Sequence, residues 1–132
     1  MQVWRMCSKC QEQKPITEFY KRSDTHTGGY ATSCRICWGK HYAEYRRVTR
    51  EKVFDHYGRV CACCGELDDR FLTIDHVNGN GNAHRKSISP KNKGGYAIYT
   101  WFVANDFPSG FQTLCWNCNL GKYHYGICPH KL

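Results

Sequence analysis

The chain has 132 residues with a formal net charge of +8 and a pI near 9.0, and 41% of its residues are hydrophobic. That length holds one ordinary domain or two very small ones, and the basic balance indicates an anionic partner, most simply nucleic acid. A membrane-spanning protein is excluded because no stretch approaches the roughly 18 apolar residues of a membrane span.

The chain contains ten cysteines, and eight of them form four Cys-x2-Cys pairs. The N-terminal segment MQVWRMCSKC has no apolar stretch of the signal-peptide kind, so we expect a cytoplasmic protein, in which paired cysteines favour metal over disulfide. Joined in chain order, the pairs predict two structural zinc ions, each bound tetrahedrally. The predicted ligands are Cys7, Cys10, Cys34 and Cys37 for the first ion, and Cys61, Cys64, Cys115 and Cys118 for the second. Two such sites would lower the net charge to about +4.

Residues 1–40 are predicted to form the first module, a zinc ribbon or finger with four cysteine ligands. Within it, Glu18 to Arg22 and Tyr30 to Ser33 can pair as a hairpin that turns at Thr27-Gly28-Gly29. A small ribbon suits the 23 residues between the two cysteine pairs.

Residues 41–57 are predicted to be a basic connecting helix, because aromatic and apolar residues from Trp38 to Tyr57 follow a helical stripe. Arg46, Arg47 and Arg50 lie on its other faces. Two interpretations stay open: a helix that follows the phosphates of a nucleic acid, or a solvated linker between two zinc modules.

Residues 58–132 are predicted to form the second module. The run Phe71 to Ile74 is typical of a strand and leads into Asp75-His76, while Phe111 to Leu114 is a second strand that leads into Cys115 and a short helix. Between the strands we expect a polar loop and a helix over residues 96–106. The polar stretch carries His84, Arg85 and Lys86, which either contact phosphates, with His84 a further metal ligand, or form a solvated loop.

The second zinc would fix three polar side chains near one another. One of its Cys-x2-Cys pairs precedes the first strand of this module and the other follows the second strand. Asp75 and His76 end the first strand, and Asn119 follows the last cysteine. A carboxylate and an amide oxygen suit Mg²⁺ or Mn²⁺, and a neutral histidine can take a proton from water. The three residues therefore predict metal-dependent phosphodiester hydrolysis.

This order of Cys-x2-Cys, Asp-His after a strand, and Leu-Cys-x2-Cys-Asn resembles the HNH nucleases of the ββα-metal fold. Over about residues 57–123 it is especially similar to the HNN variety found in phage recombination endonuclease VII and in small, homing-like phage endonucleases. The resemblance implies an α+β fold with an inserted loop and helix, two structural zinc ions and one catalytic Mg²⁺ or Mn²⁺. It also implies duplex or branched DNA as substrate, other phage DNA-processing proteins as partners, and the host-cell cytoplasm as location.

By the same resemblance, Asp75 and Asn119 hold the catalytic metal, His76 is the general base, and the products carry 5′-phosphate and 3′-hydroxyl ends. Where the family usually has a bracing Asn, this chain has Gly110. We interpret residues 78–110 as an insertion that adds substrate contacts.

A second interpretation is a nucleic-acid-binding adaptor with two zincs and a degenerate HNH core, and a third is a ribonuclease. Cys63 competes with Cys61 as a zinc ligand, but the x2 spacing favours Cys61. Cys128 and His130, with His124, resemble a leftover metal motif; packing and tail chemistry are the expected roles, and those of Cys63, Cys128 and His130 stay open.

Overall fold

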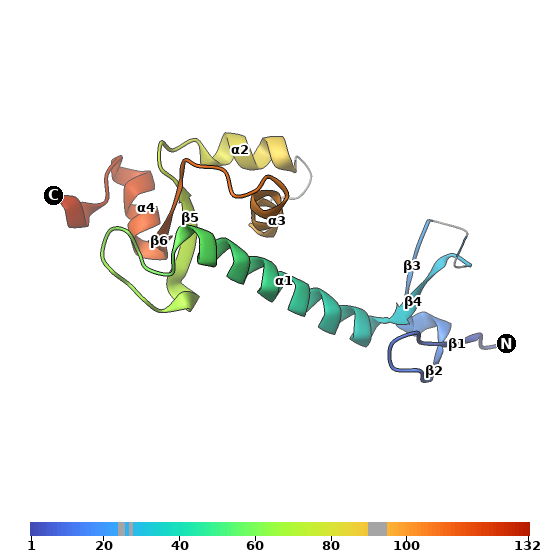
Figure 1. Cartoon of the computed structure of the whole chain (residues 1–132). Helices are drawn as coiled ribbons and strands as arrows, with labels where there is room; N and C mark the ends of the chain where they lie inside the picture. Colours follow the sequence, from blue (N-terminus) through green and yellow to red (C-terminus); the bar gives the residue numbers. More distant parts are fainter. Residues whose placement is uncertain (24–25, 27, 90–94) are drawn as a thin grey trace. The chain divides into compact units, whose positions relative to one another are not determined.

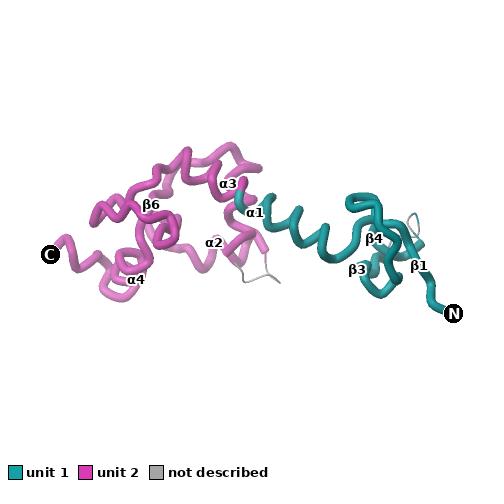
Figure 2. Tube along the Cα trace, turned by 90° about the horizontal axis from the view of Figure 1, so that it is seen from below, with its two compact units in different colours: residues 1–47 teal, residues 48–132 magenta. Residues whose placement is uncertain are grey.

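The computed structural model describes residues 1–23, 26, 28–89 and 95–132 (Figure 1). These residues form two compact units, residues 1–47 and residues 48–132, and helix α1 (Arg35–Tyr57) runs through the boundary (Figure 2). The described ranges contain four α-helices and three two-stranded antiparallel sheets, which confirms the predicted α+β class. No helix in those ranges combines the length and apolar character needed to cross a bilayer.

The first unit consists of two short hairpins followed by the start of α1. Strand β1 (Trp4–Met6) pairs with β2 (Gln13–Pro15), and a 3-10 turn, η1 (Ile16–Glu18), connects them to the second hairpin. There β3 (Phe19–Lys21) pairs with β4 (Tyr30–Cys34), which confirms the predicted strand pairing. Of the predicted turn, Thr27 lies outside the described residues, whereas Gly28 and Gly29 have φ of +67° and +77°, values that glycine adopts without steric cost.

The core of the first unit is very small. Its fully buried residues are Cys7, Phe19 and Cys34, so two of the three carry sulfur rather than a hydrocarbon side chain. A core of this size supplies little hydrophobic free energy, so a metal ion held by the cysteines of this unit would add substantially to its stability.

The second unit is built on one hairpin and the helix that follows it. Strand β5 (Leu72–His76) runs antiparallel to β6 (Phe111–Cys115), and α4 (Trp116–Tyr125) begins directly after β6. The register places Asp75 opposite Gln112 and His76 opposite Phe111. The 3-10 turns η2 (Asp69–Phe71) and η3 (Pro129–Lys131) lie before β5 and after α4.

Two further helices lie between the strands of this hairpin in the sequence. Helix α3 (Tyr96–Ala104) falls within the predicted range, and its Ile98 and Phe102 are buried against Val53 of α1. The segment 78–110 is therefore more than an added substrate-binding loop, since α3 supplies part of the core.

Helix α2 (Gly81–Ile88) was not predicted, and the polar loop expected here is helical instead. No side chain caps its N-terminus, where Asn80 has φ of +73°, and none of its residues is buried. The apolar stripe that usually reveals a helix in a sequence is thus weak, and the Asn-Gly pairs at the start of α2 are typical of a turn.

Candidate functional site

The predicted zinc ligands of the first unit lie together. The Sγ atoms of Cys7, Cys10, Cys34 and Cys37 are all within 4.8 Å of one another, and none of the ten cysteines forms a disulfide. The backbone N–H groups of Lys9 and Cys34 donate to Cys7 Sγ at 3.4 and 3.2 Å. Burial alone raises the pKa of Cys7, but backbone N–H groups lower it to about 6. This group has the four sulfurs and the thiolate character that a zinc ion requires.

The second predicted group is equally compact. The Sγ atoms of Cys61, Cys64, Cys115 and Cys118 lie within 4.8 Å of one another, with Cys64 Sγ 3.7 Å from Cys115 Sγ. Two sulfurs on one tetrahedral zinc lie about 3.8 Å apart, so the spacing fits that ion. Cys61, and not Cys63, completes the group, as the x2 spacing predicted.

The first Cys-x2-Cys pair of each group lies in a backbone turn of the same type. Gly65 N–H donates to Cys61 O at 3.0 Å, and Gln11 N–H donates to Cys7 O at 2.9 Å. Both donors have a positive φ, +79° for Gly65 and +58° for Gln11. The turn directs the sulfurs of each Cys-x2-Cys pair to the same side, as a shared metal requires.

The three residues predicted to carry chemistry line one cleft of about 730 Å³ in the second unit. Asp75 and His76 come from the end of β5, and Asn119 comes from the first turns of α4. Arg85 and Lys122 line the same cleft and give it basic side chains. Cys118 places Asn119 there, because the cysteine belongs to the second sulfur group and Asn119 is the next residue.

The Asp75 carboxylate is buried and held by two donors. Gln112 Nε2 and Lys122 Nζ donate to the same oxygen, Oδ2, at 2.8 and 2.5 Å. The Lys122 ammonium also donates to the backbone oxygens of His76 and Val77, at 2.7 and 2.9 Å. Lys122 thereby connects α4 to the end of β5 through three acceptors.

Neither Gln112 nor Lys122 was predicted as a site residue, although both leave a signal in the sequence. Gln112 faces Asp75 across the hairpin, a pairing that follows once the strand register is known. Lys122 lies three residues after Asn119, so the two share one face of α4.

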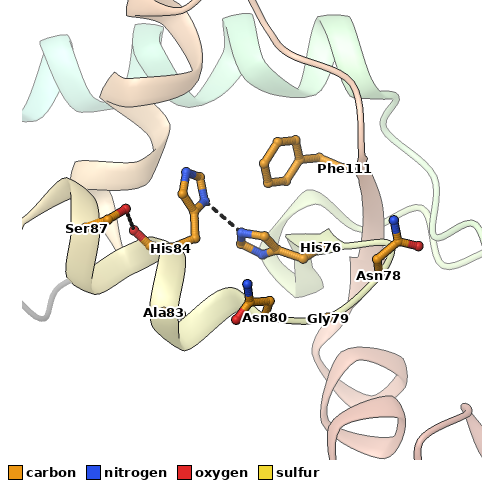
Figure 3. Close-up of a pocket in the computed structure, with 8 residues that line it drawn as sticks. All are labelled: His76, Asn78, Gly79, Asn80, Ala83, His84, Ser87 and Phe111. Carbon is orange, nitrogen blue, oxygen red and sulfur yellow. Dashed lines mark hydrogen bonds between the residues drawn. The ribbon is translucent and has the colours of Figure 1, made fainter.

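His76 contacts an aromatic ring and a second histidine (Figure 3). Its Nε2 lies 2.8 Å from His84 Nδ1, and its ring centroid lies 4.7 Å from that of Phe111. A Cβ atom on Gly81 would lie 3.1 Å from His76 Nδ1, so a side chain at position 81 would crowd the imidazole ring. Burial lowers the pKa of His76, and electrostatic interaction with the neighbouring His84 and Arg85 lowers it further.

Gly110 contributes to this region through its backbone. Its carbonyl accepts a hydrogen bond from Val77 N–H at 3.0 Å, which extends the ladder between β5 and β6 past His76. Its φ is +94°, a conformation that a residue with a Cβ rarely adopts. In this chain the residues that contact the His76 ring are His84 and Phe111, and not a side chain at position 110.

Comparisons with protein-family models, with curated proteins and with solved structures found no match to this chain. The functional assignment therefore rests on the chemistry of the cleft and of the sulfur groups.

The basic residues predicted to contact nucleic acid have defined surroundings. On α1, Arg47 pairs with Glu44 at 2.7 Å and Arg46 lies over the Tyr42 ring. Arg50 donates to the backbone oxygens of residues 69 and 72, so it also connects α1 to the start of β5. On α2, Arg85 donates to Asn82 at 2.9 Å, and Lys86 is exposed.

Proposed function

We propose that this protein is a metal-dependent DNA endonuclease that hydrolyses phosphodiester bonds. The observation that carries the proposal is that Asp75, His76 and Asn119 line one cleft beside a group of four cysteine sulfurs. The hairpin followed by a helix, with sulfurs at the junctions, is also the arrangement that the resemblance to the ββα-metal nucleases implies.

Asp75 and Asn119 would hold a catalytic Mg²⁺ or Mn²⁺. Both supply hard oxygen ligands, which these ions prefer. Gln112 and Lys122 bind Oδ2 of Asp75, which leaves Oδ1 for a ligand in the cleft. When bound, the ion would stabilise the negative charge that develops on the phosphate and on the leaving oxygen.

His76 would act as the general base. Its lowered pKa keeps the imidazole neutral near pH 7, the form that accepts a proton. If Nε2–H donates to His84 Nδ1, the lone pair of His76 Nδ1 is free to accept the proton of a water molecule. His84 is then a positioning residue, because it fixes the tautomer and the ring orientation of the base.

The basic side chains around the cleft would bind the phosphates of the substrate. Arg85 lines the cleft and Lys86 lies next to it on α2. The formal net charge of +8 stays positive, at about +4, when the two predicted zinc sites are filled. These contacts are not base-specific, which fits duplex or branched DNA. The resemblance further implies 5′-phosphate and 3′-hydroxyl products.

One observation favours a second function, a nucleic-acid-binding adaptor with an inactive core. The ion pair between Lys122 and Asp75 places a cation on the carboxylate that would bind the metal. In an adaptor this pair would be permanent, and the cleft would bind phosphate without cutting it.

A nicking assay distinguishes the two functions. Supercoiled plasmid is incubated with the zinc-loaded protein in a buffer without free divalent ions, and Mg²⁺ or Mn²⁺ is then added. The negative control leaves out the added ion and contains no EDTA, because EDTA would also remove the zinc. We expect nicking only with the added ion and a loss of about 100-fold or more in His76→Ala. A labelled RNA duplex in parallel reactions separates a deoxyribonuclease from a ribonuclease.

His41→Ala is the matched control, because His41 is an exposed histidine on α1 outside the proposed site. It should nick at the wild-type rate. A wild-type protein that shifts DNA in a gel but never nicks it, with either ion, would support the adaptor and exclude the endonuclease.

A further inference from the structure

The two predicted zinc groups account for eight of the ten cysteines and leave Cys63 and Cys128 over. Cys63 lies inside the knuckle that contains Cys61 and Cys64, and Cys128 lies in the tail after α4. The structure brings the two sulfurs together with Cys118 Sγ and a ring nitrogen of His130, all within 4.8 Å of one another.

The spacing within this third group matches a metal centre. His130 Nδ1 lies 3.3 Å from Cys118 Sγ and 3.4 Å from Cys128 Sγ. A nitrogen and a sulfur on one tetrahedral zinc lie about 3.6 Å apart, within a few tenths of an ångström of both distances. A single ring nitrogen offers one lone pair or one proton, so a hydrogen bond satisfies only one of the two sulfurs, whereas one zinc ion binds both.

The backbone of the segment after α4 packs closely against α4 at the third group. Cys128 and Cys118 are buried, with 5% and 0% of their surfaces exposed. A Cβ on Gly121 of α4 would lie 2.9 Å from Pro129 Cδ and 3.9 Å from Cys128 Sγ, so only glycine permits the approach. The 3-10 turn η3 then places His130 beside the two sulfurs.

We propose that Cys63, Cys118, Cys128 and His130 bind a zinc ion, and that the Cys118 thiolate bridges it to the zinc of Cys61, Cys64 and Cys115. The second unit would then hold a two-zinc centre with six thiolates and one imidazole. The added ion brings two positive charges and its two additional thiolates bring two negative charges, so the net charge does not change. The assignment of Cys128 and His130 to packing is replaced by a ligand role, and His124 is not part of the group.

This centre would attach the tail to α4 next to Asn119, independently of whether the cleft cuts DNA. Each chain would carry three zinc ions, two in the second unit and one in the first. Zinc counting by native mass spectrometry of the full chain tests the number directly. Three ions per chain are expected, and a fully loaded protein with two would overturn the proposal.

Variants locate the additional ion. Cys128→Ser and His130→Ala should each lower the count from three to two, because each removes a ligand of the third group only. His124→Ala is the matched control, since His124 is exposed and lies outside the group. It should retain three ions, and retention of three in both ligand variants would overturn the assignment.

The shared thiolate is tested without any variant, which avoids loss of folding. The wild-type chain is loaded with ¹¹³Cd²⁺, which occupies zinc-thiolate sites and is visible by NMR. We expect three cadmium signals, two of them split by coupling through the Cys118 sulfur. Three uncoupled signals would overturn the bridge, and two signals would overturn the third site.

Discussion

His76 and His84 form a direct pair, with Nε2 of His76 2.8 Å from Nδ1 of His84 and the two rings at 81°. His84 belongs to α2, and its ring lies 4.3 Å from Trp101 of α3, so the pair connects the end of β5 to both inserted helices. The inserted segment therefore orients the proposed base.

Replacing His84 tests this orientation. In His84→Ala the proposed base loses its partner, and we expect the nicking rate to fall about 10–100-fold, as for other residues that orient a functional group. The acidic limb of the pH–rate profile should move to higher pH, because burial of His76 and its electrostatic interaction with His84 both lower the pKa of His76. A variant with the wild-type rate and profile would show that His84 has no role in positioning.

The pH dependence of nicking follows from the buried position of His76. Burial and nearby positive charges lower its pKa below the ordinary 6.5, so the neutral base persists to more acidic pH than a free imidazole allows. The rate should be insensitive to His76 titration above pH 6.5 and should fall as the pH drops through the lowered pKa. Initial rates at constant ionic strength measure this, and a midpoint above 6.5 would contradict the assignment.

The same shift affects folding. Because the unfolded chain binds more protons than the folded one between the lowered pKa and 6.5, stability should rise with pH through that window and be lower below it. Urea denaturation of the zinc-loaded protein at several pH values measures the slope. His76→Ala should reduce the slope of stability against pH. An unchanged slope in this variant would show that other groups cause it.

The Lys122–Asp75 pair should contribute more to stability than an exposed pair. Lys122→Ala removes the partner of a buried carboxylate and two hydrogen bonds to backbone oxygens, so we expect a loss of about 2–3 kcal/mol in the free energy of unfolding. The control is Arg70→Ala, whose side chain is 84% exposed in its pair with Asp68, with an expected effect of about 0.5 kcal/mol or less. Denaturant titrations that gave equal losses of stability for Lys122→Ala and Arg70→Ala would contradict this prediction.

Two glycine-to-alanine substitutions within helices should have opposite effects. Gly121→Ala places a Cβ against Pro129 and should destabilise the second unit by about 1–3 kcal/mol and weaken zinc retention in the third group. Gly39→Ala on α1 meets nothing within 4 Å and should stabilise the helix by about 0.5–1 kcal/mol. Thermal unfolding and zinc release under a competing chelator measure both, and a neutral Gly121→Ala would argue against a tightly packed tail.

The sequence allowed the cysteine pairs and the final hairpin to be predicted, because both follow from local patterns. A Cys-x2-Cys turn and a short apolar run each specify a structure over a few residues, and the order of the pairs suggested which strands are neighbours. Asp75, His76 and Asn119 could be placed near one another for this reason.

The remaining features depend on contacts between distant segments. Helix α2 begins within the second of two Asn-Gly dipeptides, which are typical of turns, and none of its residues is buried, so its sequence resembles a loop. Lys122 reaches Asp75 only once α4 packs beside β5. The third sulfur group joins positions 63, 118, 128 and 130, a spacing that matches no regular zinc motif.

Helix α4 places residues with different roles next to one another in the sequence. Cys118 is a shared sulfur, Asn119 lines the cleft, Gly121 admits the tail and Lys122 holds Asp75. In a saturation library, positions 118, 119, 121 and 122 should each tolerate few substitutions, whereas the exposed Leu120 between them should tolerate more.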